Sequence, residues 1–478
     1  MSKVFKCIYS VLFFVLLALP LALMPLWGSN EAIEKRALTK FPAYMKDGRL
    51  NLEFSDQFEA WFNDRIPFRS WLLSASNLLQ GEWLQGETSN VIVGKDGWLF
   101  YATESADYMD TNHLSDDQIR AMAVTLSLIQ ENVESRGGHF VFVSVPNKSS
   151  VYGEYMPERY LAGEESNLDR IQAALPEYEV NFVDMKDILT AHKEEGVYHR
   201  RDSHWNYLGA VIGCDAILCS LGREHPSFAN APFTIEKTWR GDLDKLIYPA
   251  GGTLDDQYVF DIVHASFHFE ALKGSPQGTK DPLAQLEIFM SDKEKNDDLF
   301  TAVNEDLADG SMLYMVRDSF GRALLPYMID SYETATFKRT DRPDLSAVAD
   351  GSDLVYEIAE RNLARIISTA PFMYAPVRDK LDISGYSDGG NLQIRAESQG
   401  YGLRICGAFP GDTPLGDGRV YLLLEQNGKT QVVEAFPILD QQLKQDGVIC
   451  GFTAIVPKDA GFDADVSITV IVGNCQYH

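Results

Sequence analysis

The chain has 478 residues, too many for one small hydrophobic core, so its length predicts two or three domains. Hydrophobic residues make up 45% of the chain and charged residues 23%, proportions that are typical of a folded globular protein. The formal net charge of −27 excludes nucleic acid as a partner and makes an anionic lipid surface a poor one, because both need concentrated Lys and Arg.

The N-terminal segment predicts a membrane anchor. Lys3 and Lys6 precede an uncharged apolar stretch, Cys7 to Trp27, that is long enough to span a bilayer as a helix with its N-terminus in the cytoplasm. We therefore expect residues 1–27 to be an uncleaved signal-anchor of a single-pass cell-membrane protein whose remainder is extracytoplasmic. A cleaved signal peptide is the alternative, and it would make the protein secreted, but no clean cleavage site precedes Gly28.

Residues 28–90 predict a helical stem. Phe54, Phe58 and Trp61 recur at helical spacing, and Pro67 interrupts the pattern. We expect these aromatic side chains to pack on the main domain rather than to form a ligand-binding box.

Short apolar runs then alternate with amphipathic helical patterns over residues 91–373. Asp96-Gly97 tolerates the positive φ of a tight turn and predicts a hairpin. Ser115 is expected to cap a long helix that ends before Gly137. The continuous apolar run 139–145 is typical of a strand buried on both faces of a parallel sheet.

The alternation continues along this region and predicts its fold class. Further strands are expected at 180–185, 312–316 and 353–358, and further helices near 167–175 and 206–221. The predicted architecture is α/β, a doubly wound parallel sheet flanked by helices. Residues 223–310 break the rhythm and are interpreted as an insertion or long excursion.

The C-terminal residues 374–478 lose helical periodicity. Short strands alternate with Gly- and Asp-rich turns, which predicts a small antiparallel β-sandwich. Three cysteines lie here, so that one pair can form a disulfide and leave one thiol: Cys406, Cys450 and Cys475.

Ser319 is the candidate nucleophile. It follows an apolar strand and precedes a predicted helix, a position that exposes a side chain at the carboxyl edge of the sheet beside helix N-terminal amides. Capping of that helix is the competing explanation and, for Ser319 alone, the commoner one.

The segment HRRDSHWN supplies a candidate base. Asp202 lies two residues before His204, close enough in sequence for the carboxylate to orient the imidazole that a serine nucleophile needs. Trp205 and a helix follow. The neighbouring basic run His199 to Arg201 could hold an anionic sugar, although a solvated loop is the commoner explanation.

Taken together, these motifs resemble a known group. Asp-Ser-His-Trp at 202–205, followed by Asp-Ser-Phe at 318–320, is similar to the SGNH-hydrolase-like proteins of the alginate O-acetyltransferase type, including the bacterial DHHW family. The similarity extends over roughly residues 30–373 and includes GKDGWLFY at 94–101 and DLVYEIAERNL at 353–363.

The resemblance implies an extracytoplasmic O-acetyltransferase or O-acetylesterase acting on a cell-surface or secreted polysaccharide. Ser319 would be its nucleophile, His204 its base and Asp202 the orienting acid. The acyl donor would arrive through a membrane O-acyltransferase, and no cofactor is implied. In this sequence Arg317 stands where classical SGNH enzymes have glycine, so the turn must form without glycine's freedom.

Secondary site residues are less sharply defined. The candidates for oxyanion or substrate binding are Phe320, Asn147, Lys148 and Trp205. Loop capping explains Asn147 equally well, and a solvated side chain is the alternative for Lys148. His264 and His268 lack a nearby carboxylate ligand set, so no metal site is predicted.

Two other interpretations of the chain remain open at this point. A non-catalytic polysaccharide-binding or scaffold component of a cell-envelope machine would retain the same fold. A cell-wall assembly factor would depend on the anchor and stem more than on the pocket. In the C-terminal region, Tyr401 or Phe409 could contact carbohydrate, although aromatic residues more often fill a core.

Overall fold

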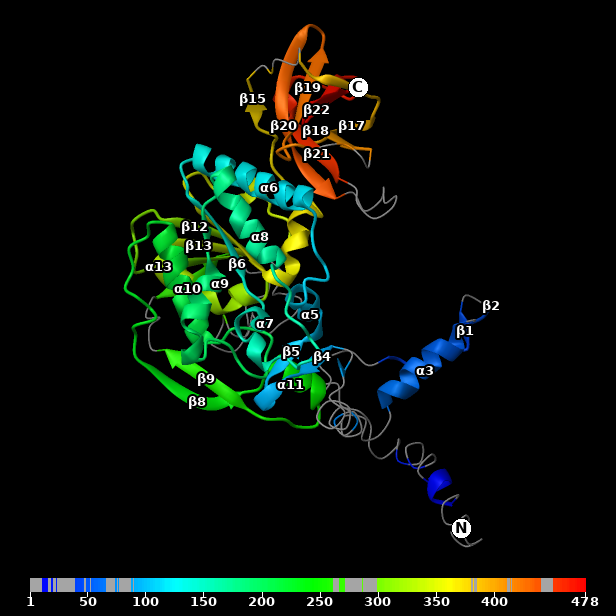
Figure 1. The fold of residues 1–478 in the computed structure, drawn as a ribbon, viewed down its shortest axis with the longest axis vertical. Coiled ribbons are helices and arrows are strands. Elements are labelled where there is room, and N and C mark those ends of the chain that lie inside the picture. Colours follow the sequence, from blue (N-terminus) through cyan, green and yellow to red (C-terminus); the bar gives the residue numbers. More distant parts are fainter. Residues whose placement is uncertain are drawn as a thin grey trace. The chain divides into compact units, whose positions relative to one another are not determined.

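The structure is a computed structural model of the chain. It describes residues 11–15, 19, 23, 39–46, 49–51, 53–65, 74, 76, 87–88, 90–260, 266–270, 286, 299–379, 381, 385–410, 413, 415–439 and 450–478. The chain divides into two compact units. Figure 1 labels the helices and strands. The first unit comprises residues 1–102, 200–203 and 237–256, and the second comprises 103–199, 204–236 and 257–478.

The predicted anchor falls almost entirely outside the described residues. Of positions 1–27 the structure describes only 11–15, 19 and 23. Within the described part of the chain, no helix combines the length and the apolar character needed to cross a membrane.

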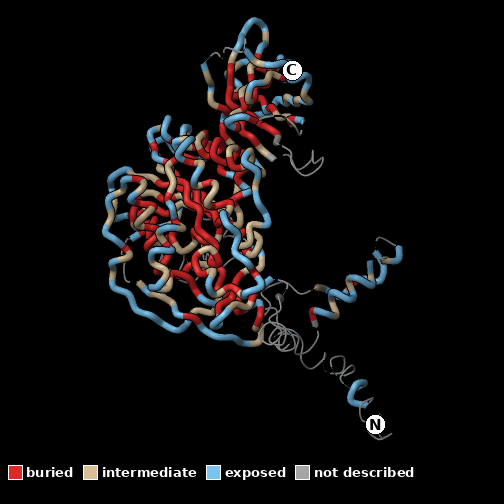
Figure 2. Tube along the Cα trace, viewed as in Figure 1, coloured by how far each residue is buried: buried red, intermediate tan, exposed pale blue. Residues whose placement is uncertain are grey.

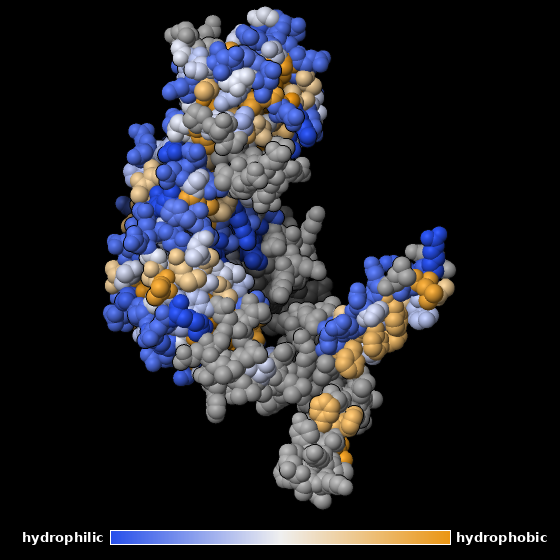
Figure 3. Space-filling model, turned by 45° about the vertical axis from the view of Figure 1, so that its right-hand side comes forward, coloured by the Kyte–Doolittle hydropathy of each residue, from blue (hydrophilic) through white to orange (hydrophobic). Residues whose placement is uncertain are grey.

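The first unit contains the aromatic stem. Strands β1 (Met45–Lys46) and β2 (Arg49–Leu50) pair and precede helix α3 (Phe54–Arg65), which confirms a helix at the predicted aromatic pattern. The ring of Phe41 lies 6.1 Å from that of Phe58 and 4.8 Å from that of Trp61. Phe58 is exposed, and hydrophobic side chains are visible along this segment in Figure 3.

A small sheet in the first unit confirms the predicted hairpin. Strand β4 (Val91–Val93) pairs with β5 (Leu99–Tyr101) and with β3 (Glu87–Thr88). At the turn, Asp96 has φ of 53° and Gly97 has φ of 78°, the left-handed conformation that Asp-Gly accepts. Apolar residues of β4 and β5 pack against helix α11 (Asp242–Ile247).

A seven-stranded mixed sheet forms the centre of the second unit. Its order is β10-β11-β13-β12-β14-β6-β7, in which the last five strands are parallel and β10 and β11 are antiparallel to their neighbours. The strands span Phe267–Glu270 (β10), Phe300–Asn304 (β11), Thr334–Arg339 (β13), Met312–Arg317 (β12), Asp353–Ala359 (β14), Phe140–Val145 (β6) and Phe182–Val183 (β7). The α/β prediction is confirmed, but an entirely parallel sheet is wrong.

The two antiparallel strands come from the segment interpreted as an excursion. Sequence analysis also missed β13, because its alternating Thr, Phe and Lys residues lack the continuous apolar run of a buried strand. The excursion also contains β8 (Phe233–Trp239), which pairs with β9 (Asp255–Phe260).

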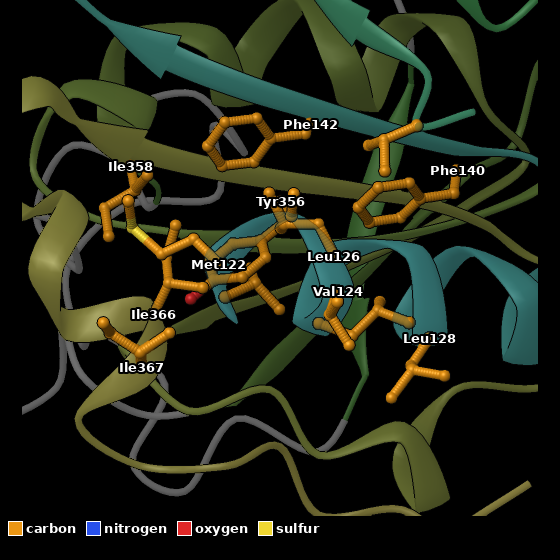
Figure 4. Close-up of a cluster of buried hydrophobic side chains, with 14 of the residues drawn as sticks. Met122, Val124, Leu126, Leu128, Phe140, Phe142, Tyr356, Ile358, Ile366 and Ile367 are labelled. Atoms are coloured by element: carbon orange, nitrogen blue, oxygen red, sulfur yellow. The ribbon is translucent and has the colours of Figure 1, made fainter. Parts of the chain in front are cut away.

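Helices cover both faces of the central sheet. They span Asp116–Ser135 (α6), Asn167–Ala174 (α8), Met185–Ala191 (α9), Tyr207–Ser220 (α10) and Leu325–Ser331 (α13). On one face, Phe142 and Tyr356 of adjacent strands meet Met122 and Leu126 of α6 (Figure 4). Helices α10 and α13 contact the strands without joining that cluster. Buried residues follow the strands through the unit (Figure 2).

The long helix α6 begins as the sequence predicts. Ser115 accepts a hydrogen bond from the Gln118 N–H while the Gln118 side chain accepts one from the Ser115 N–H, a complete capping box. Gly137, with φ of 84°, follows the helix end and leads the chain toward β6.

The C-terminal part of the second unit is rich in β-sheet, as predicted. Its strands span Val377–Arg378 (β15), Ser387–Gly390 (β16), Gln393–Gln399 (β17), Gly402–Ala408 (β18), Val420–Gln426 (β19), Lys429–Leu439 (β20), Cys450–Pro457 (β21), Ser467–Val472 (β22) and Cys475–Tyr477 (β23). The first half of β20 pairs with β19 and its end pairs with β21. Strand β20 therefore links the group of strands around β19 to the group around β21. Phe409 is buried against Phe452 in the core between them.

The predicted disulfide among the three C-terminal cysteines does not form, because Cys406 and Cys475 are both thiols. Cys475 is a free thiol, which excludes a bridge to either of the other two C-terminal cysteines. The side chain of Cys450 lies outside the described residues.

Candidate active site

Three parallel strands deliver polar residues to one edge of the central sheet. Strands β12, β14 and β6 are neighbours in that order, and parallel strands end at the same edge. Ser319 follows β12, Arg361 follows β14, and Asn147 follows β6. The carboxyl edge of an open α/β sheet is where such folds bind ligands.

The Asp318 carboxylate holds the Ser319 turn. Its Oδ1 accepts a hydrogen bond from the Phe320 N–H at 2.8 Å. Its Oδ2 accepts from the Ala359 N–H at 2.9 Å and from the Asn362 side-chain amide at 3.0 Å. These bonds tie the loop after β12 to the end of β14, which fixes the backbone on both sides of Ser319.

A second buried carboxylate, that of Glu357, also holds this turn. One oxygen of Glu357 accepts from the N–H groups of Asp318 and Gly321, each at 3.0 Å. Burial, reinforced by the nearby Asp318 charge, raises the pKa of Glu357 well above its usual value. Arg317 is also fully buried, and burial lowers its pKa to about 10.

Ser319 itself does not cap the helix that follows. Its backbone is right-handed helical, with φ of −72°, and its side chain makes no capping bond to the 3-10 helix η8 (Phe320–Leu324). Helix capping, the competing explanation for Ser319, is therefore wrong. Arg317 is not among the described residues with a positive φ, so the turn needs no glycine at that position.

The histidine motif lies against the residue after Ser319. The indole Nε1–H of Trp205 donates to the Phe320 carbonyl at 3.1 Å, and the His204 ring lies 4.8 Å from the Phe320 ring. Trp205 is held in turn by a β-bridge to Tyr198 just before α10. Packing therefore brings together two motifs that lie 115 residues apart.

Asp202 belongs to the first unit and is oriented there. It is buried, and its Oδ2 accepts from the Trp239 indole at 3.0 Å and from the Asp242 N–H at 2.9 Å. The Asp242 carboxylate accepts from the N–H and hydroxyl of Ser203 at 2.7 and 2.6 Å. A Cβ on Gly241 would meet the Arg201 carbonyl at 2.0 Å, so this approach requires glycine.

Two of the predicted oxyanion donors already donate hydrogen bonds to carboxylates. The Phe320 N–H is bound to Asp318, as described above. Asn147 is fully buried, with its backbone N–H donating to Glu360 at 2.7 Å and its side-chain amide donating to Asp107 at 2.9 Å. The structure therefore gives neither group to an incoming oxyanion.

Lys148 is not a solvated surface residue. It is fully buried at the start of the short helix α7 (Lys148–Val151), and its ammonium donates to the His199 carbonyl at 3.1 Å. The solvated-loop interpretation of the basic run is also wrong for Arg201. Within the first unit, Arg201 Nε pairs with the fully buried Asp244 at 2.6 Å.

Sequence analysis missed several buried acids near this edge. Burial raises the pKa of Glu104 to about 7, against the opposing charges of Arg361 and Lys148. Burial likewise raises the pKa of Glu360 to about 7. The available signal was a charged residue inside an apolar strand, as in DLVYEIAERNL, where Glu357 interrupts the run.

Arg361 connects these acids to the serine turn. Its Nη1 lies 3.5 Å from a Glu104 oxygen, and its guanidinium lies 5.0 Å over the Phe320 ring. A cation on the aromatic face complements the negative charge of the ring's π cloud. The Phe320 ring is thus packed between Arg361 and the His204–Trp205 pair.

Comparison with known proteins agrees with the motifs. Residues 91–248 match the family described as the SGNH hydrolase-like domain of the acetyltransferase AlgX. These residues are therefore similar to an SGNH hydrolase-like domain. The resemblance predicted from the motifs is confirmed, and the matched range includes Asp202 and His204 but ends before Ser319.

The curated relatives match only part of the chain. A probable alginate O-acetylase AlgJ of Pseudomonas syringae pv. tomato is 24% identical over 196 residues, 40% of this chain and 48% of that protein. AlgJ of Pseudomonas aeruginosa is 24% identical over 217 residues, 44% of this chain and 54% of that protein. The chain therefore spans about half the length of these curated relatives.

A solved structure is also similar to the chain. A DHHW family protein from Eubacterium siraeum aligns with a TM-score of 0.44 at 19% identity. The alignment covers 58% of this chain and 93% of that one.

Proposed function

We propose that this protein is an extracytoplasmic serine acyl-transfer enzyme, an O-acetyltransferase or O-acetylesterase that acts on a polysaccharide. Ser319 is the nucleophile, His204 the general base and Asp202 the acid that orients the base. The hydrogen bond from Trp205 to the Phe320 carbonyl carries this proposal, because it seats the histidine motif on the residue after Ser319. The family match and the named activity of the relatives support the reaction class.

The chemistry follows from the roles of these groups. His204 removes the Ser319 hydroxyl proton as the oxygen attacks the carbonyl carbon of an acetyl ester. The tetrahedral intermediate collapses, His204 protonates the departing alcohol, and an acetyl-serine remains. A sugar hydroxyl or water then attacks that ester with His204 as base again, giving transfer or hydrolysis.

The oxyanion must be stabilised by a donor that is not already used. The N–H of Ser319 makes no hydrogen bond to any described residue, unlike that of Phe320. We assign the Ser319 N–H as the oxyanion donor because it belongs to the nucleophilic residue itself. One such donor typically contributes about 3 kcal/mol to transition-state stabilisation.

The substrate, donor and location follow from the same assignment. The relatives are named as alginate O-acetylases, so we propose a polysaccharide acceptor for this chain. Acetyl groups would arrive from a membrane O-acyltransferase. Residues 1–27 would anchor the enzyme in the cell membrane, and removal of these residues should release the protein from the membrane fraction.

A direct test compares variants in hydrolysis of p-nitrophenyl acetate. We expect Ser319→Ala and His204→Ala each to lower kcat by about 10²-fold or more, because each removes a group that acts in the reacting state. Ser135→Ala serves as the matched control, since Ser135 is exposed at the end of α6. Equal rates for wild type and Ser319→Ala would leave the non-catalytic binding function as the better account.

The direction of acyl transfer needs a second measurement. Adding an unacetylated oligosaccharide to the reaction provides a sugar hydroxyl acceptor. A transferase should yield acetylated sugar in proportion to acceptor concentration, whereas an esterase should release acetate at an unchanged rate. Both products should be lost together in Ser319→Ala.

A further inference from the structure

The long excursion after α10 contributes residues 237–256 to the first unit. The same unit contains residues 200–203, the segment that carries Asp202. The sequence indicates no role for this excursion, yet its residues form hydrogen bonds with Arg201, Asp202 and Ser203. This part of the excursion therefore packs on the segment that supplies the acid of the proposed triad.

The excursion fixes the backbone on both sides of Asp202. On one side, the Arg201 N–H donates to the Asp255 carboxylate at 2.7 Å. On the other side, the Ser203 N–H donates to the Asp242 carboxylate at 2.7 Å. Because the residues before and after it are both held, the main chain cannot turn at Asp202 without breaking one of these bonds.

The carboxylate of Asp202 is held by the same segment. Asp202 is 3% exposed, and its Oδ2 accepts from the Trp239 indole N–H at 3.0 Å and from the Asp242 N–H at 2.9 Å. Two donors on one oxygen favour the charged carboxylate, which is the form that orients an imidazole and stabilises an imidazolium. Rotation of the side chain would break both bonds at once.

Asp242 links these two sets of contacts. Its Oδ2 accepts from the Ser203 hydroxyl at 2.6 Å, and its Oδ1 accepts from the N–H groups of Ser203 and Leu243, each at 2.7 Å. Its backbone N–H meanwhile holds Asp202. One residue therefore fixes both Asp202 and the residue that separates Asp202 from His204.

Trp239 is set apart from the rest of its strand. The first six residues of β8 are exposed, and only Trp239, the last residue of the strand, is half-buried. Its indole N–H reaches a buried carboxylate rather than solvent. The burial pattern of β8 therefore indicates that Trp239 is the residue through which this strand contributes to the interior.

We propose that Trp239 and Asp242 are positioning residues that hold the Asp202 carboxylate in the orientation required for catalysis. The proposal rests on the proposed function, which assigns Asp202 as the acid that orients His204. Neither residue exchanges a proton with the substrate. They act through Asp202, because an acid that orients the base works only while its own direction is fixed.

The first test measures kcat and KM for p-nitrophenyl acetate with the full-length protein. Trp239→Phe keeps an aromatic ring but removes the N–H, so kcat should fall about tenfold at unchanged KM, the effect of one lost bond to a charged group. Ser203→Ala removes one bond to Asp242 and should lower kcat about threefold. Trp61→Phe, on α3 against Phe41, is the matched control and should keep the wild-type kcat.

The second test repeats Trp239→Phe in an Asp202→Ala background. A residue that acts through Asp202 has nothing to position once that carboxylate is gone, so Trp239→Phe should cause no further loss of kcat there. A merely structural role would lower kcat by the same factor in both backgrounds. Urea unfolding of each variant shows that it is folded, and Ser203→Ala, the smaller change, provides the same test independently.

Two outcomes would overturn the positioning role. They are wild-type kcat in both Trp239→Phe and Ser203→Ala, and equal losses from Trp239→Phe with and without the Asp202 carboxylate. Failure of the proposed function gives a different result, because Asp202→Ala or Ser319→Ala would then hydrolyse the ester at the wild-type rate. Loss of activity in those two variants with none in Trp239→Phe and Ser203→Ala would refute only the positioning role.

Discussion

Gly321 restricts what the Ser319 turn can tolerate. A Cβ at this position would lie 2.6 Å from the Glu357 carboxylate and 2.7 Å from the Arg317 Cβ. Both neighbours are fully buried, so neither can move away without disturbing the core. The glycine that this motif needs therefore follows the serine rather than preceding it, because the constraint is a close approach and not a positive φ.

Gly321→Ala should lower the free energy of unfolding by about 1–3 kcal/mol, the usual cost of overpacking a tight site. It should also reduce ester hydrolysis, because the Gly321 N–H shares the Glu357 oxygen that holds Asp318. Urea denaturation and p-nitrophenyl acetate kinetics would measure both effects. Gly400→Ala is the control, since a Cβ there meets no atom within 4 Å. Equal losses in the two variants would contradict this account.

At the scale of elements, the ends of β6 and β14 bring acids together in the interior. Glu104 and Glu360 are both fully buried near these strand ends. Burial raises the pKa of each to about 7 from its ordinary value of 4.5. The folded state therefore holds protons that the unfolded chain has already released between these two pH values.

This difference predicts how stability depends on pH. A carboxyl with a raised folded-state pKa contributes stability fully below its unfolded value, and that contribution is lost as pH rises through its folded value. Stability should thus fall between pH 4.5 and about 7 on account of Glu104. The side chain of Glu104→Gln stays neutral at every pH. The free energy of unfolding of this variant, measured with urea, should therefore fall less over that pH interval.

An exposed carboxyl provides the comparison for this pH experiment. Glu134→Gln changes the same side chain on the outer side of α6. Its pH dependence should match that of the wild type. A wild-type and a Glu104→Gln curve that run parallel from acid to neutral pH would show that Glu104 is not the group responsible.

At the scale of the molecule's second unit, Arg378 joins the C-terminal sheets to the α/β part. Its Nε lies 2.6 Å from Glu434, a carboxylate that is only 1% exposed, and its Nη groups bond Glu131. Arg419 supplies a second cation to Glu434 at 2.7 Å. The two sheet-bearing parts are thus connected through a partly buried charge network as well as through apolar packing.

Arg378→Met should destabilise the protein by about 1–3 kcal/mol, because it leaves a buried carboxylate with fewer partners. Calorimetry should show the C-terminal sheets unfolding at a lower temperature than the rest. Arg365→Met removes an exposed pair with Asp341, 54% and 40% exposed, and should cost at most about 1 kcal/mol. A larger loss from Arg365→Met than from Arg378→Met would refute this role.

Local chemistry made several features predictable from sequence. The Asp96-Gly97 hairpin and the Ser115 cap depend on residues close together in the chain, and both are present. The strand 139–145 and the β-rich C-terminal region follow from hydrophobic patterning, which reports burial directly. The family resemblance depends on short motifs and was likewise visible in the sequence.

Other features were decided only by tertiary structure. Whether Ser319 caps a helix depends on Asp318 and Glu357, and the second of these lies on another strand. Similarly, β10, β11 and β13 join the central sheet through long-range pairing that carries little local signal. Sequence patterns therefore determined the helices and the continuous apolar strands. Packing determined the remaining strands and which polar groups meet, because buried hydrogen bonds and charges depend on neighbours distant in the chain.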